Sequence, residues 1–338
     1  MIRYDCFMGD HESGGGGSRR GIPAPRVVAG RYRLGVRVGR GGFGDVYGAH
    51  DERTDRRVAV KVMPPTEMGD KARAMFLKEA ARTARVSHPG IVEVYDAGFD
   101  DATPYLVMEL LVGQTVSERL AARGPMGSAR ALSIVDRVLE ALVALHAGDV
   151  LHGDIQPANV FLTRGGLVKL IDFGLSRRWA AQSDEYDIRG TPPYIPPEVI
   201  LGEGPDPRSD LYSVGLLAFA MLAGQDAYVV RTNIVQVFYD VLAGSAPSVA
   251  DFRPSVSPAV VALVTKAMAL HRKDRYQDAR AFRRALAPLL RLAHERPSSR
   301  PPRPVSTIPA TPTALERPVE LADPNANVPG TLMGLRDD

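Results

Sequence analysis

The stretch His152-Gly153-Asp154-Ile155-Gln156-Pro157-Ala158-Asn159, followed by Asp172-Phe173-Gly174, says most about the fold of this chain. Asp154 stands five residues before Asn159, and Asp172 follows the short apolar run 168–171. Phosphoryl transfer from a nucleotide needs a carboxylate at the attacking hydroxyl, and a carboxylate and an amide oxygen on magnesium. Hard oxygen ligands suit that ion. The pattern therefore predicts a phosphoryl-transfer site, or a chain descended from one.

A glycine-rich stretch precedes this region, Val38-Gly39-Arg40-Gly41-Gly42-Phe43-Gly44-Asp45-Val46-Tyr47. Glycine lets the backbone approach phosphate oxygens closely and adopt dihedral angles that other residues avoid. Dinucleotide-binding folds share the glycine spacing, but their glycines open a helix. Val46-Tyr47 favours a strand instead. The stretch therefore predicts a hairpin that binds phosphate.

The apolar strand Val58-Ala59-Val60-Lys61 carries one lysine. A lysine is costly to bury unless an anion is its partner. Glu79, on a helix expected to start near Asp70, is the natural partner, and Lys61 would then hold the α- and β-phosphates. The alternative is a lysine whose stem lies against the sheet while its ammonium reaches solvent.

The hydrophobic pattern changes once along the chain. Residues 31 to about 106 alternate apolar and polar in short runs, which favours antiparallel strands, and one helical stretch over 70–86 interrupts them. The expected strands are 32–38, 45–50, 58–63 and 91–97. From Ser128 onward the pattern is helical, with apolar faces that recur at 211–223, 231–242, 258–270 and 278–293. An α+β fold follows, with a small, mainly antiparallel lobe that has one helix, a larger α-helical lobe, and a cleft between them.

Both flanks differ from this core in composition. Residues 1–30 form a leader rich in Gly and Arg, and residues 294–338 form a tail rich in Pro, Ser and Thr. Such compositions favour disorder, so the folded domain is expected over 31–293, with lobes at about 31–108 and 112–293. The formal charge of +3, from 42 Lys+Arg against 39 Asp+Glu, does not indicate nucleic acid as a partner.

Location is judged from the cysteines and the apolar runs. The single cysteine, Cys6, allows no disulfide framework. Residues 1–10 carry charges where a signal peptide needs an apolar core. The best membrane candidate, 211–223, is shorter than the ~20 residues that a span requires, so we expect a buried helix. These features together favour a cytoplasmic protein without a membrane span.

The motifs together resemble the eukaryotic-type (Hanks-type) serine/threonine protein kinases, in particular their bacterial branch, over about residues 32 to 290. The glycine loop, the strand lysine and the catalytic loop all match. The segment 190–198 resembles the family's stretch ending in Ala-Pro-Glu, with Pro196 in place of the Ala. Asp210 resembles the helix-start Asp that receives backbone N–H groups from the catalytic loop, and Arg275 would pair with Glu198.

This resemblance implies a bilobal protein kinase-like fold and ATP-dependent phosphorylation of protein Ser/Thr hydroxyls, including autophosphorylation. ATP and Mg²⁺ would be the cofactors, with Mn²⁺ as an alternative metal. The implied catalytic residues are Lys61, Asp154, Asn159 and Asp172, of which Asn159 and Asp172 would bind the metal. The implied nucleotide-binding residues are Val38, Gly39, Arg40, Gly41, Gly42, Phe43, Gly44, Val46, Ala59, Lys61, Glu79, Glu109, Leu111 and Phe161.

Within that set the adenine would lie between Val38, Val46, Ala59 and Phe161. Met108 would be the gatekeeper, and the backbone of 109–111 the hinge that pairs with the base edge. His152 and Phe173 would pack in the internal column that aligns the lobes. His152 is interpreted as a satisfied core histidine and not as a base.

Two residues depart from the family's His-Arg-Asp-x-Lys-x-x-Asn loop: Gly153 replaces the Arg and Gln156 replaces the Lys. Gln156 donates a hydrogen bond but neutralises no charge, which predicts a slower enzyme. Without the arginine, activity should depend weakly on phosphorylation of Ser176, Ser183 or Tyr186. Two alternatives remain: a pseudokinase scaffold, and a small-molecule phosphotransferase similar to aminoglycoside and choline kinases, whose loop Gly153 matches.

The tail offers one further hypothesis about partners. Thr307, Thr311, Thr313 and Thr331 lie in sequence expected to be flexible. If autophosphorylated, they would recruit phosphothreonine-reading domains, and the Pro-rich tail would suit Pro-binding partners. An inert tail is the alternative.

Overall fold

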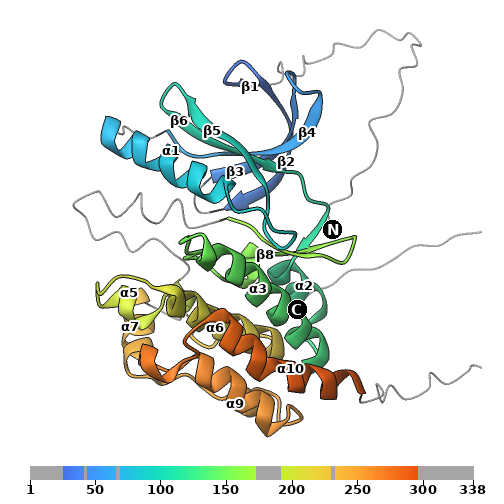
Figure 1. Ribbon diagram of the computed structural model, residues 1–338, viewed down its shortest axis with the longest axis vertical. Helices are drawn as coiled ribbons and strands as arrows, with labels where there is room; N and C mark the ends of the chain where they lie inside the picture. Colours follow the sequence, from blue (N-terminus) through green and yellow to red (C-terminus); the bar gives the residue numbers. More distant parts are fainter. Residues whose placement is uncertain (1–25, 42–43, 66–68, 173–191, 230–232, 296–338) are drawn as a thin grey trace, which may run out of the picture. The chain divides into compact units, whose positions relative to one another are not determined.

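The computed structural model describes residues 26–41, 44–65, 69–172, 192–229 and 233–295. These residues form a sheet with one helix alongside it and a second, helical half (Figure 1). The architecture confirms the α+β expectation, with a mainly antiparallel lobe first in sequence and a helical lobe after it.

The first lobe is built on a six-stranded antiparallel sheet of order β1-β2-β3-β4-β6-β5. Its strands are β1 Val27–Val28, β2 Tyr32–Gly41, β3 Gly44–Asp51, β4 Arg56–Val62, β5 Val94–Asp100 and β6 Thr103–Glu109. Helix α1, Asp70–Ala84, packs on β5, where Phe76 meets Phe99 edge to face. The helix stops two residues before the expected end, where the Arg85 N–H bonds back to Arg82 O and the Val86 N–H to Thr83 O, a tighter i→i−3 pattern than that of the α-helix.

One expected strand is shifted along the chain. The apolar run 91–97 predicted a strand there, but β5 begins only at Val94. Ile91 pairs in parallel with Leu170 of the other lobe instead. The apolar residues at 91 and 92 are buried by this contact between the lobes, and not by the main sheet.

A small three-stranded sheet carries the loops that hold the motif residues. It consists of β7 Gly113–Thr115, β8 Val160–Thr163 and β9 Val168–Leu170, in the order β7-β8-β9. The short helix α2, Val116–Arg123, follows β7 directly and begins with a capping box between Thr115 and Glu118. The turn η1, Pro157–Asn159, leads into β8 and places Asn159 beside the sheet.

The helical lobe packs around α6. Its helices are α3 Ser128–Ala147, α5 Pro197–Ile200, α6 Pro207–Ala223, α7 Ile234–Leu242, α8 Val249–Phe252, α9 Pro258–Ala267 and α10 Ala279–Glu295, with the turns η2 Pro192–Tyr194 and η3 Arg272–Asp274. Helix α6 is buried from Ser209 to Leu222, which confirms the buried helix expected at 211–223. Figure 1 shows α3, α6, α9 and α10 stacked in this half. In the part of the chain described, no helix is both long and apolar enough to span a bilayer.

Candidate active site

The glycine-rich stretch forms the hairpin between β2 and β3. Gly39 pairs with Val46, Arg40 with Asp45, and Gly41 with Gly44. Gly44 has φ +135°, and a Cβ there would lie 2.3 Å from the carbonyl oxygen of Val62. Only glycine fits so close to β4. Gly42 and Phe43 lie outside the described residues.

Lys61 is buried in the middle of the sheet, on β4, opposite Val46 and Leu106. Its Nζ donates to Asp172 Oδ1 at 2.9 Å, across the two lobes. A carboxylate partner offsets the cost of burying the ammonium. Glu79 lies on α1 and is half-buried; its pairing with Lys61 stays a prediction.

Asp172 follows β9 and has φ +54°, a left-handed conformation that is uncommon for residues other than glycine. Backbone held in such a region often marks a functional site. This conformation accompanies the placement of the carboxylate within reach of Lys61. Phe173, Gly174 and the rest of the segment to Thr191, with Ser176, Ser183 and Tyr186, lie outside the described residues.

Asp154 is buried, and neutral amides hold its carboxylate. Its Oδ2 accepts hydrogen bonds from Gln156 Nε2 at 3.0 Å and from Asn159 Nδ2 at 2.7 Å. Asn159 Nδ2 also donates to the Asp154 backbone carbonyl at 2.8 Å. The predicted catalytic carboxylate, Asp154, and the predicted metal ligand, Asn159, are thus joined directly.

Asp210, at the start of α6, holds the backbone of this loop. Its carboxylate accepts from the His152 N–H at 3.0 Å and the Gly153 N–H at 2.8 Å, which confirms the expected contact. His146 Nε2 lies 2.8 Å from the same carboxylate. Burial would raise the pKa of Asp210, but the hydrogen bond from His146 and its charge lower it overall.

His152 is fully buried, and burial lowers the pKa of its imidazole because the charged form is disfavoured. Its Nε2 lies 3.2 Å from the Ile171 carbonyl, and its Nδ1 lies 3.3 Å from the Asp154 N–H. A single neutral tautomer satisfies both contacts, with Nε2 as donor and Nδ1 as acceptor. The histidine is therefore a core residue with its hydrogen bonds made, as interpreted from the sequence.

The residues expected around the adenine come from both sheets. Ala59 and Met108 are paired neighbours on β4 and β6, and both are buried. Val38 and Val46 are half-buried on the hairpin strands, and Phe161 is half-buried on β8. Leu111 packs against the core next to the end of β6. Their roles toward a nucleotide stay predictions.

A buried ion pair anchors the helical lobe. Arg275 donates to both carboxylate oxygens of Glu198, at 2.9 and 2.8 Å, which confirms the expected pair. Ser209 also donates to Glu198. Burial would raise the pKa of Glu198, but the hydrogen bonds from Arg275 and Ser209 lower it overall. Arg275 reaches three backbone carbonyls as well and lies over the Tyr212 ring.

Sequence reasoning missed two contacts of this region. His146 on Asp210 has no signal in a motif, since it lies on α3, five residues (147–151) before the motif that starts at His152. The pairing of Lys169 with Glu109, at 2.8 Å, joins residues sixty positions apart. The sequence signal that could have indicated this pair is a single lysine, Lys169, within the apolar run 168–171; the structure shows that this lysine is buried.

The donor atoms fit a magnesium ion. Asn159 uses its amide nitrogen on Asp154, so its Oδ1 is the atom that would face a cation. Asp172 supplies a carboxylate whose Oδ1 already meets Lys61. Magnesium is usually held by one or two carboxylates with water and substrate phosphates. Asn159 and Asp172 would hold such an ion and neutralise charge on the phosphates.

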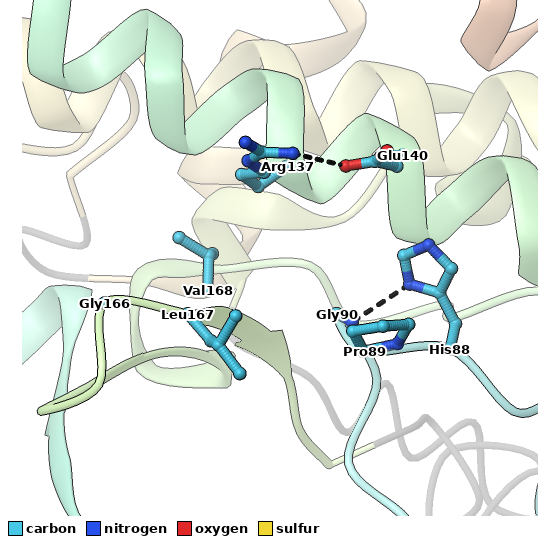
Figure 2. A pocket seen from close by; sticks show the side chains of 8 residues that line it. All are labelled: His88, Pro89, Gly90, Arg137, Glu140, Gly166, Leu167 and Val168. Carbon is cyan, nitrogen blue, oxygen red and sulfur yellow. Dashed lines mark hydrogen bonds and ion pairs between the residues drawn. The ribbon is translucent and has the colours of Figure 1, made fainter.

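A cavity of about 320 Å³ lies away from these residues. It is lined by His88, Pro89, Gly90, Arg137, Glu140, Gly166, Leu167 and Val168 (Figure 2). None of the predicted site residues lines it. Figure 2 shows the Arg137–Glu140 ion pair on α3 at one side and the loop 88–90 at the other. The cavity lies between α3 and the β8–β9 turn. Because no motif residue lines it, we place the candidate site at the motif residues and not in this cavity.

Comparison with known proteins identifies the family of this domain. Residues 32–285 match the family model described as the protein kinase domain. A probable serine/threonine-protein kinase of Streptomyces coelicolor, SCO3848, is 39% identical over 269 residues, covering 77% of this chain and 40% of its own length. Serine/threonine-protein kinase PknL of Mycobacterium tuberculosis is 38% identical over 255 residues, covering 75% and 64%.

A solved structure agrees in fold. The crystal structure of Rad53 1-466 in complex with AMP-PNP matches with a TM-score of 0.63 and 25% identity, over 75% of this chain and 64% of that one. The chain spans between 40% and 64% of the length of these two curated relatives. The matched family is the protein kinase domain, not that of the small-molecule phosphotransferases.

Proposed function

The chain belongs to the protein kinase family, and from this premise we propose that it transfers the γ-phosphoryl group of ATP to Ser or Thr hydroxyls of proteins, its own included. The observation that carries the proposal is the joining of Lys61 to Asp172 and of Asp154 to Asn159. The relatives named serine/threonine-protein kinases support the choice of acceptor.

In this proposal each residue has one task. Lys61 would hold the α- and β-phosphates, and Asn159 and Asp172 would hold magnesium, whose charge would offset that of the phosphates. Asp154 orients the substrate hydroxyl and receives its proton as the oxygen bonds to the γ-phosphorus. The bond from that phosphorus to the β–γ bridging oxygen breaks, and ADP leaves. Positioning and charge stabilisation supply most of the catalysis in such reactions.

The rate is proposed to be reduced. The loop 152–159 contains no lysine or arginine, so it adds no positive charge near the transferred phosphate. A charge-assisted hydrogen bond contributes roughly 1.5–3 kcal/mol against ~1 kcal/mol for a neutral one. A second candidate, a pseudokinase that binds nucleotide without transfer, is favoured by the same two residues, Gly153 and Gln156.

The experiment that separates these candidates is label transfer from radiolabelled ATP with magnesium, in the full chain. We expect label in the chain itself and in a basic acceptor protein, and none with Asp172→Ala. Asp154→Asn should keep nucleotide binding and lose transfer by at least ~10²-fold, since it removes the hydroxyl's partner. Nucleotide binding without label in the wild type would replace the kinase with the pseudokinase.

Two finer points belong to the same proposal. The reaction is placed in the cytoplasm, because ATP is its donor. The threonines 307, 311, 313 and 331, which lie outside the described residues, are proposed as autophosphorylation sites for phosphothreonine-reading partners. Mass spectrometry of the tail after incubation with ATP tests this: unmodified tail peptides would remove the idea.

A further inference from the structure

Lys169 is a buried lysine that the reaction does not use. It lies in the middle of β9, between Val168 and Leu170, and is only 6% exposed. Its position in the register is opposite Phe161 on β8. Burying an ammonium on so short a strand is costly unless its charge and hydrogen bonds are satisfied. The partners of Lys169 therefore indicate what it does.

The ammonium of Lys169 joins three segments. It donates to Glu109 Oε2 at 2.8 Å and to the Ile91 carbonyl at 3.3 Å. Glu109 is the last residue of β6, where the chain passes from the first lobe to the second. The segment 90–92 is itself bonded to β9, because the Leu170 N–H meets Gly90 O and the Val92 N–H meets Leu170 O. Lys169 thus fixes the end of β6 against β9.

Both neighbours of Lys169 belong to the expected adenine site. Phe161 is the residue expected beneath the base, and Glu109 begins the backbone stretch expected to pair with its edge. We propose that Lys169 is a positioning residue for the base: it sets the distance between this backbone edge and β8 without touching the nucleotide. The inference rests on the proposed function, since it assumes that ATP binds there.

The charge of the Lys169 ammonium is what holds the Glu109 carboxylate at β9. Glu109 is 29% exposed at its side chain, so its carboxylate has water as an alternative partner. With Lys169 present, the ion pair draws the carboxylate and its backbone toward β9. Without the ammonium, the carboxylate would turn to solvent and the edge of the hinge would loosen. The phosphate end of the site, at Lys61 and Asp172, would not change.

The test is nucleotide affinity of the full chain with magnesium, measured by calorimetry for ATP and by competition for GTP. Lys169→Met keeps the volume and removes the charge. We expect ATP to bind about tenfold more weakly, the effect of roughly one lost hydrogen bond. GTP, which presents a different base edge, should change by less than about twofold on the same reasoning.

Three further variants make the result specific. Lys169→Arg should restore most of the ATP affinity, and Glu109→Gln should reproduce the loss if Lys169→Met does not fold. The double variant should match the single ones, because both remove the same contact. Arg137→Met is the control, since it removes an ion pair of 2.9 Å that is 60% and 35% exposed. It should leave both affinities unchanged.

Each other outcome decides against the inference in a different way. Unchanged ATP affinity in Lys169→Met and in Glu109→Gln would overturn the positioning role and leave the proposed function standing. Equal losses for ATP and GTP would show a general structural role, and would also overturn it. A wild-type chain that binds no ATP would overturn the proposed function and this inference together.

Discussion

Asp154 and Glu198 are both buried carboxylates of the helical lobe, but different partners hold them. Glu198 is paired through two oxygens with the fully buried Arg275. Asp154 receives hydrogen bonds from the neutral amides of Gln156 and Asn159. The ion pair lies in the interior of the helical lobe, where both side chains are buried. At the carboxylate expected to meet a substrate, the contacts are weaker and easier to rearrange.

The largest expected effect is the loss of stability when the Arg275–Glu198 ion pair is broken. Arg275→Met should lower the free energy of unfolding by about 3–5 kcal/mol, because it removes both hydrogen bonds that Arg275 donates to the buried Glu198 and leaves only the more distant Arg272, at 3.7 Å, as a nearby cation. Urea unfolding followed by fluorescence measures it. Arg283→Met is the control: its pair with Asp136, at 2.8 Å, is partly exposed and should contribute at most about 1 kcal/mol. Equal losses in both variants would contradict the distinction.

Acid should weaken the same anchors. The pKa values of Glu198 and Asp210 are lowered from their ordinary 4.5 and 3.8. Their contribution to stability is therefore full above those ordinary values, and is lost as the pH falls through the lower, folded-state values. Each group adds up to about 1.4 kcal/mol per pH unit to the slope in that window.

Urea midpoints measured from pH 6 down to acid unfolding check this expectation. Stability should fall gently from pH 6, because the buried His152 favours its neutral form, and more steeply below about pH 4.5, the ordinary pKa of Glu198. Asp210→Asn should have a shallower fall than the wild type, because one titrating group is removed. An identical slope in the variant would show that Asp210 does not contribute.

The fold was largely predictable because its periodic elements are long. The expected helix from Ser128 is α3, and the antiparallel runs are β2 to β4. Boundaries were less predictable. The apolar pattern suggested 211 as a helix start, yet α6 begins at Pro207, because Asp206 caps it and Pro207 favours the first turn. The short helix α2 was not predicted. Its sequence signal is the Thr115–Glu118 capping box at its start.

The sequence could indicate which residues belong to the candidate site, but not which of them contact one another. Motif spacing indicated that Lys61, Asp154, Asn159 and Asp172 act together, but spacing carries no distances. It did not indicate the contact of Lys61 with Asp172, and the pairing of Lys61 with Glu79 stays a prediction. Nor could it pair Lys169 with Glu109, because such contacts depend on how the two lobes meet.

Gly153 lies in the same loop as Asp154 and has a backbone conformation that favours glycine. Its φ is +74°, and a Cβ placed there would meet no atom within 4 Å. Gly153→Ala should therefore cost about 1–2 kcal/mol from backbone conformation alone, with no clash. Gly165→Ala is the matched control, since its nearest neighbour is at 3.9 Å and its φ lies outside the left-handed region. Thermal unfolding measures both, and a neutral Gly153→Ala would contradict the strain argument.

The smallest expected effect comes from giving Asp154 a charged neighbour in place of the neutral Gln156. Gln156 is buried, and its amide lies 3.0 Å from Asp154 Oδ2, so a lysine there would reach the same carboxylate, where the proposed function brings the transferred phosphate. Gln156→Lys should raise kcat by about tenfold, because a charge-assisted contact replaces a neutral one. Gln156→Leu removes the donor and should lower kcat. Label incorporation at saturating ATP measures both variants. A slower Gln156→Lys would mean that Asp154 needs a neutral neighbour, and the amide would then be a requirement of this loop.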